Sequence, residues 1–157
     1  MNKNGEQFYE LLLAHGFDVN VESVRHVIQG RWLTFREAEE LVISRTGFEE
    51  YTKDMPCYRV MYDMIRVMAE VYMIASRSME ATMDIGGEER TAGMVADVYA
   101  EIKAIDLERL WEKIGSFLPK VNSIKSYLRA AIYNTVFEGG TDDERETERV
   151  MREMGRL

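Results

Sequence analysis

The chain has 157 residues, of which 46% are hydrophobic and 31% charged. This composition is typical of a globular protein with a real core and excludes a disordered one. A formal net charge of -8 disfavours broad binding to nucleic acid, because acidic side chains repel phosphates at long range. Two prolines and frequent Glu, Ala, Met, Leu and Arg favour helix. We therefore expect a mostly α-helical, compact bundle.

The pattern of residues 1–53 predicts a small acidic lobe of three short helices. The first helix ends before Gly16, and the second spans about residues 21–29 and stops at a glycine. Thr34 and Glu37 form a capping box that opens the third helix. This third helix carries carboxylates where a DNA-reading helix would meet phosphates, so we interpret the second and third helices as an ordinary helical hairpin.

A longer helix is predicted after this lobe. Asp54 is a candidate N-cap, Pro56 suits a first helical turn, and the helix is expected to reach about Met79. The side chains at i, i+3 and i+4 spacing along it are Tyr58, Met61, Tyr62, Ile65, Met68, Ala69, Tyr72, Ala75, Ser76 and Met79. We interpret this stripe as core in preference to a ligand groove, and the helix as the central one.

Two glycines predict a small β-hairpin near residues 82–90. Gly86 and Gly87 separate two short runs, which is the pattern of a two-residue hairpin turn. They are not a phosphate-binding loop, because no strand–loop–helix motif with a lysine accompanies them. Thr91 is then expected to open a helix that runs to about Lys103.

The segment 106–140 is the part of the chain in which basic side chains outnumber acidic ones. Asp106 is expected to cap one amphipathic helix, Pro119 ends it, and Asn122 or Ser123 opens a second. The candidate residues for binding nucleic acid or a protein partner are Lys113, Lys120, Lys125, Arg129, Tyr127 and Tyr133. The other interpretation, in which these cations complement the acidic remainder of the molecule, stays open.

No catalytic or metal-binding constellation appears in the sequence. Cys57 is the only cysteine, which excludes an internal disulfide and a cysteine zinc cluster, and we expect a buried thiol. His15 and His26 are the only histidines, and both are distant from Cys57 in sequence. Neighbouring acidic pairs diverge around a helix axis instead of converging on one ion. We expect a non-enzymatic protein with no cofactor and no metal.

The sequence predicts three segments. They are an acidic helical lobe (1–53), a helical module (54–140) and a charged helical tail (141–157) with a small apolar face. No basic segment precedes a long apolar run at the start, and no window approaches the roughly 20 apolar residues of a membrane span. We expect a cytoplasmic protein without membrane contact.

Two stretches within 62–138 carry a family pattern, YDMIRVMAEVYMIASRSMEATMDIGGEERTAGMVADVYAEI and DLERLWEKIGSFLPKVNSIKSYLRAAIYN. The pattern I-K-x-Y-L-x-x-x-x-Y-N is present at Ile124, Lys125, Tyr127, Leu128, Tyr133 and Asn134. The region resembles the C-terminal, DnaD-like domain of the replication initiator protein A family of Gram-positive plasmids and conjugative elements. The resemblance implies a helical module that recruits replication proteins or contacts DNA. The family's winged-helix domain has no counterpart in 1–53, so origin recognition is not implied.

These observations predict a mobile-element or phage protein that acts as a replication-associated interaction module. It would recruit a replication protein, or contact DNA weakly, through the basic residues named above. The alternative is a small acidic inhibitor, of the anti-CRISPR type, that occupies the basic channel of a nucleic-acid-binding host protein or defence nuclease. Its acidic face would consist of Glu37, Glu39, Glu40, Glu49 and Glu50. A homodimer formed through the long helix is a third expectation.

Overall fold

The computed structural model describes residues 3–116, 118–120 and 123–137. The elements in chain order are α1 (Lys3–Ala14), α2 (Glu22–Val27), α3 (Phe35–Thr46), η1 (Phe48–Glu50), α4 (Tyr58–Arg77), β1 (Thr82–Ile85), β2 (Glu88–Thr91), α5 (Ala92–Tyr99), α6 (Ala104–Ile114) and η2 (Leu118–Lys120). Residues 124–137 form a further helix, called here the 124–137 helix. The predicted fold class, mostly α-helical with one small hairpin, is confirmed.

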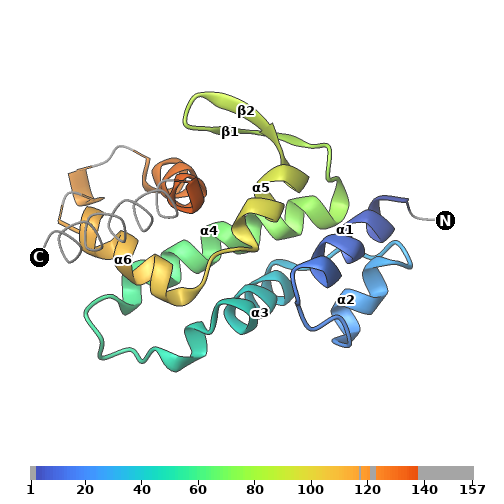
Figure 1. The fold of residues 1–157 in the computed structure, drawn as a ribbon, viewed down its shortest axis with the longest axis horizontal. Coiled ribbons are helices and arrows are strands. Elements are labelled where there is room, and N and C mark those ends of the chain that lie inside the picture. The colour runs from blue at the N-terminus through green and yellow to red at the C-terminus, as the bar shows by residue number, and fades with distance from the viewer. Residues whose placement is uncertain (1–2, 117, 121–122, 138–157) are drawn as a thin grey trace, which may run out of the picture.

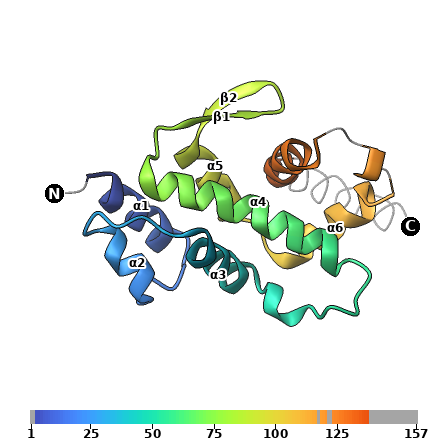
Figure 2. The ribbon, with the colours of Figure 1, turned by 180° about the vertical axis from the view of Figure 1, so that it is seen from behind.

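α4 is the helix around which the other elements pack. It runs through the middle of the molecule in Figures 1 and 2 and contacts α1, α3, α5 and α6. Most of the predicted stripe is buried, but Met64, Val67 and Val71 lie off the stripe and are buried too. A helix that is apolar on several sides has to be covered on several sides. α4 is therefore the centre of the core and not one wall of it.

The lobe 1–53 and the module that follows share one core. The buried cluster runs from Phe8 in α1 to Tyr133 in the 124–137 helix. Asn4 ties the two segments at the end of α4, where its Nδ2 donates to the carbonyl oxygens of Ala75 and Ser76 at 3.2 Å. The last carbonyls of a helix have no partner within the helix, so a side chain from α1 satisfies two of them.

The hairpin and α5 form as predicted. β1 and β2 pair antiparallel in the register Thr82↔Thr91 to Ile85↔Glu88. Gly86 and Gly87 both have positive φ, 62° and 91°, which glycine adopts without steric cost. The hydroxyl oxygen of Thr91 accepts from the Met94 N–H at 3.2 Å and caps α5, which ends at Tyr99, earlier than predicted.

Two helix starts differ from the prediction, and one is confirmed. α4 begins at Tyr58 without a side-chain cap, and Asp54 lies before the cap position, where its carboxylate accepts a local hydrogen bond from the Thr52 hydroxyl. Asp106 lies inside the first turn of α6, where it accepts from the Lys103 N–H at 2.8 Å. The capping box that opens α3 is present as predicted.

Two helices each leave an aliphatic side chain at the surface. α2 ends at Val27, two residues earlier than predicted, and Ile28 just after it is 37% exposed. In the 124–137 helix Ile124 is 42% exposed, whereas Leu128 and Ile132 are fully buried. The docked face of this helix is thus the one that carries Leu128 and Ile132. The predicted charged tail 141–157 lies outside the described residues.

We expect Leu128→Ala to lower the free energy of unfolding by about 2–5 kcal/mol, because it opens a cavity in a fully buried site. Ile124→Ala, an exposed aliphatic change on the same helix, should cost less than about 0.5 kcal/mol. Urea denaturation of the two variants measures the difference. Equal losses would show that the 124–137 helix does not dock through Leu128.

Candidate functional site

Glu70 on α4 forms ion pairs with two of the predicted basic residues. Its Oε2 lies 2.5 Å from Lys125 Nζ, and its Oε1 lies 2.6 Å from a terminal nitrogen of Arg129. Glu70 and Arg129 are 23% and 16% exposed, so water and salt screen this pair less than a surface pair. The two cations thus hold the 124–137 helix on α4, and Glu70 compensates one of their two charges.

Of the two tyrosines of the predicted site, Tyr133 is not placed to stack on bases. Tyr133 is 3% exposed, and its ring centroid lies 5.0 Å from the guanidinium carbon of Arg90 and 5.4 Å from the ring centroid of Phe137. A nearly buried ring offers no free face to a base. Tyr127 is half-buried. The hydroxyl of Tyr99 donates to the Arg129 carbonyl at 2.7 Å, so this helix is also anchored through its backbone.

Lys113 and Lys120 belong to other elements. Lys113 is exposed in the last turn of α6, where a cation is favourable beside the helix C-terminus. Lys120 lies in η2, and its side chain is outside the described residues. The structure therefore brings Lys125 and Arg129 together on Glu70. Binding through the basic residues as a set stays a prediction.

Two of the five predicted acidic residues take part in the fold. Glu37 Oε1 accepts from the Thr34 N–H at 2.9 Å within the capping box. Glu39 is 18% exposed and accepts from the Tyr62 hydroxyl at 2.9 Å, and Arg66 Nε lies 4.0 Å from its second oxygen. The hydrogen bond to Glu39, together with burial, raises the pKa of Tyr62. Both carboxylates are thus engaged within the chain.

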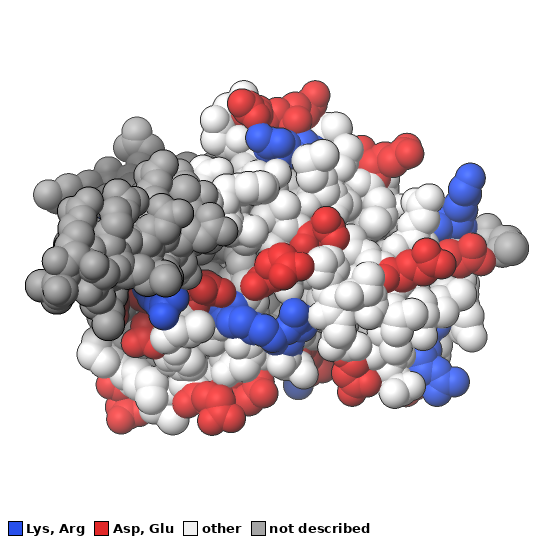
Figure 3. Space-filling model, in the orientation of Figure 1, with Lys and Arg blue, Asp and Glu red and all other residues white. Residues whose placement is uncertain are grey.

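The other three acidic residues are exposed. Glu40 pairs with Arg36 one helical turn earlier at 3.5 Å, and Glu49 and Glu50 lie on η1. Figure 3 shows one face of the molecule, where acidic side chains form separate groups divided by uncharged surface and by a short basic run. The five predicted residues therefore include three that are available at the surface.

A groove of about 430 Å³ lies beside the Glu70 cluster. Phe35 at the start of α3 lines it with apolar surface, and the buried side chains of Val67 on α4 and Leu128 adjoin it. Charged and exposed side chains at its edge are Asp63, Arg66, Glu70, Ile124 and Lys125. Sequence reasoning missed this groove, because its residues come from three helices whose packing the periodicity does not encode.

Cys57, at the start of α4, is buried in surroundings that disfavour its thiolate. The residue is 4% exposed, and burial raises the pKa of its thiol, with a further contribution from Glu108. A raised pKa disfavours the thiolate that nucleophilic chemistry needs. Glu108 also accepts from the Tyr51 hydroxyl at 2.6 Å, and burial together with this bond raises the pKa of Tyr51 to about 12.

Within the described part of the chain, no group of three or more His, Cys, Asp or Glu side chains is placed to hold a metal ion. No helix over the same residues is long and apolar enough to cross a bilayer.

Comparison of the chain with protein-family models, curated protein sequences and solved structures finds no match. The resemblance to the replication initiator family rests on the motif and order of elements described above, and it stays a prediction.

We expect Glu70→Gln to lower the free energy of unfolding by roughly 1–2 kcal/mol, because it leaves the partly buried Arg129 without its charged partner. Glu40→Gln removes the same charge from an exposed pair and should cost less than about 0.5 kcal/mol. Urea denaturation at low and high salt compares them. A loss for Glu70→Gln no greater than that for Glu40→Gln would contradict an anchoring role for this cluster.

Proposed function

We propose that the chain is a non-enzymatic, protein-binding helical module of a mobile genetic element, and that it recruits a replication protein. The observation that carries the proposal is that some residues of the I-K-x-Y-L motif are buried and others are exposed. Leu128 and Tyr133 build the core, whereas Ile124 and Lys125 remain at the surface and line the groove beside Glu70. A motif whose first two residues line a groove is suited to contact a partner.

The composition of the groove favours a protein over DNA. Its cations lie next to the carboxylates of Asp63 and Glu70, which repel a phosphate backbone. Its apolar part, with Phe35 and the exposed Ile124, suits an amphipathic helix of a partner protein. The resemblance in sequence supports a helicase or helicase loader as that partner, because the family it resembles acts in replication.

A homodimer through the long helix is not part of this proposal. Most apolar side chains of α4 are buried against other elements of the same chain. A second copy would have to displace them, at the cost of the core.

We expect a photo-crosslinking amino acid at Ile124 to capture a replication protein in the host cell, because this side chain lies exposed at the groove. The same amino acid at Met94, which is 49% exposed on α5, is the matched control and should not capture it. Mass spectrometry identifies the captured protein. Capture of the same proteins at both positions would contradict the groove as the binding site. A specific gel shift with DNA at low salt would show that the chain binds DNA and would contradict a protein as its partner.

The acidic-inhibitor alternative rests on Glu49 and Glu50, which are exposed together on η1. If the chain occupies a basic nuclease channel, Glu49→Lys with Glu50→Lys should weaken the complex at least about tenfold, and rising salt should weaken the original complex. Titration calorimetry with the co-resident nuclease measures both. An unchanged affinity would remove this alternative.

A further inference from the structure

The connection between α2 and α3 carries an exposed tryptophan past the C-terminal end of α4 (Figure 2). The Leu33 N–H donates to Ser76 Oγ at 3.1 Å, and the Leu33 side chain is buried, so this residue anchors the connection on α4. Trp32, next to it, is 56% exposed. Neither Trp32 nor Arg77, which packs on it, lines the groove beside Glu70, so a site here is independent of the proposed function.

Arg77, in the last turn of α4, holds the exposed indole. Its guanidinium carbon lies 4.3 Å from the centroid of the Trp32 ring, a distance at which the ring attracts the cation. A guanidinium stacked in this way keeps N–H groups at its rim that can donate to a carboxylate. Trp and Arg are enriched among the side chains that contribute most to protein–protein binding. Because the two already support each other, less ordering is needed when a partner binds.

A second cationic group lies where α2 ends. Gly30 has a φ of 91°, and its N–H donates to the Val27 carbonyl at 3.0 Å. The Arg31 N–H donates to the His26 carbonyl at 3.1 Å, which completes a Schellman motif and folds the chain back on the helix. A terminal nitrogen of Arg31 consequently lies 3.2 Å from His26 Nδ1. His26 and the exposed Arg25 line a hollow of about 300 Å³ on α2.

The arginines at this place differ from others in the chain, because no carboxylate pairs with them. Four arginines elsewhere each form an ion pair with a glutamate, namely Arg36, Arg66, Arg90 and Arg129. Over the same described residues, no ion pair joins Arg25, Arg31 or Arg77 to a carboxylate. All three are exposed. Residues 23–36 contain three arginines and no acidic residue, although the chain as a whole has a net charge of -8.

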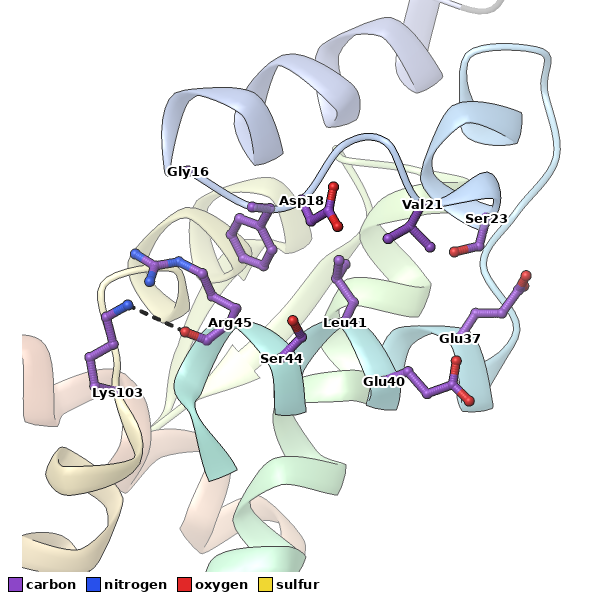
Figure 4. Close-up of a pocket in the computed structure, with 11 residues that line it drawn as sticks. Gly16, Asp18, Val21, Ser23, Glu37, Glu40, Leu41, Ser44, Arg45 and Lys103 are labelled. Carbon is purple, nitrogen blue, oxygen red and sulfur yellow. Dashed lines mark hydrogen bonds between the residues drawn. The ribbon is translucent and has the colours of Figure 1, made fainter. Parts of the chain in front are cut away.

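The acidic residues nearest in sequence do not cancel this charge. Glu37 is held in the capping box of α3 and lines a separate cavity (Figure 4). Glu22 lies 3.6 Å from His26 Nε2 and lines the hollow on α2. Glu80, three residues after Arg77, is exposed and is not paired with it. Even with Glu22 and Glu80 counted, the three arginines leave an excess of positive charge around Trp32.

We propose that the Trp32 surface, made of Arg25, Arg31, Trp32 and Arg77, binds an acidic segment of a partner protein. Carboxylates of the segment accept hydrogen bonds from the guanidinium groups, and an apolar side chain between them covers the indole. Nucleic acid is also negative, but a phosphate backbone carries a charge at every nucleotide. The net charge of -8 therefore repels nucleic acid more strongly than it repels a segment with a few carboxylates.

The test titrates the full chain with the peptide Glu-Glu-Phe-Glu-Glu, acetylated and amidated at its ends, and follows the indole N–H signals by NMR. The chain has two tryptophans, so Trp111 on α6 is an internal control. We expect the Trp32 signal to shift and the Trp111 signal to stay. We expect Gln-Gln-Phe-Gln-Gln, which lacks the charges, to bind at least about tenfold more weakly.

Three results would overturn the proposal. They are the absence of a Trp32 shift at millimolar peptide, equal binding of the two peptides, and tighter binding of single-stranded oligothymidylate than of Glu-Glu-Phe-Glu-Glu. The last result would assign the surface to nucleic acid.

Variants locate the charges that bind. Arg77→Gln should raise the Kd for Glu-Glu-Phe-Glu-Glu about tenfold, because it removes the cation stacked on the indole. Arg59→Gln is the matched control, since it makes the same change at another exposed position on α4, and it should leave the Kd unaltered. Arg31→Gln tests the second cationic group should Arg77→Gln alter the fold. An unchanged Kd in both surface variants, or an equal rise in Arg59→Gln, would overturn the assignment.

Discussion

The burial of α4 on several sides is the constraint on which the rest of the structure depends. Met64, Val67 and Val71 lie off the main apolar stripe, so no single neighbour can cover the helix. α1, α3, α5 and α6 all contact it, and Asn4 satisfies carbonyls at its end. The N-terminal lobe is thereby joined to the remainder through one core, because the same helix needs surface from both segments.

The charges follow from this arrangement. A buried central helix leaves few places for an acidic side chain, and Glu70 lies where the 124–137 helix crosses α4. Arg129 and Lys125 pair with it, so two of the basic side chains of this segment take part in the fold.

The groove beside Glu70 and a second cavity of about 490 Å³ both adjoin α3. Phe35, at the start of α3, lines the groove, whose edge carries both acidic and basic side chains. Arg45, in the last turn, lines the cavity, which also contains carboxylates and cations. α3 thereby contributes to two separate surface hollows.

The sequence alone determined the helical class, the hairpin at Gly86 and Gly87 and the caps at Thr34 and Thr91, because backbone conformation and local hydrogen bonds encode these features within a few residues. Periodicity also located the central helix. Only the tertiary structure decided that Ile124 faces outward and that Arg129 meets Glu70. These depend on which faces of distant helices meet, and spacing along one helix carries no information about its neighbours.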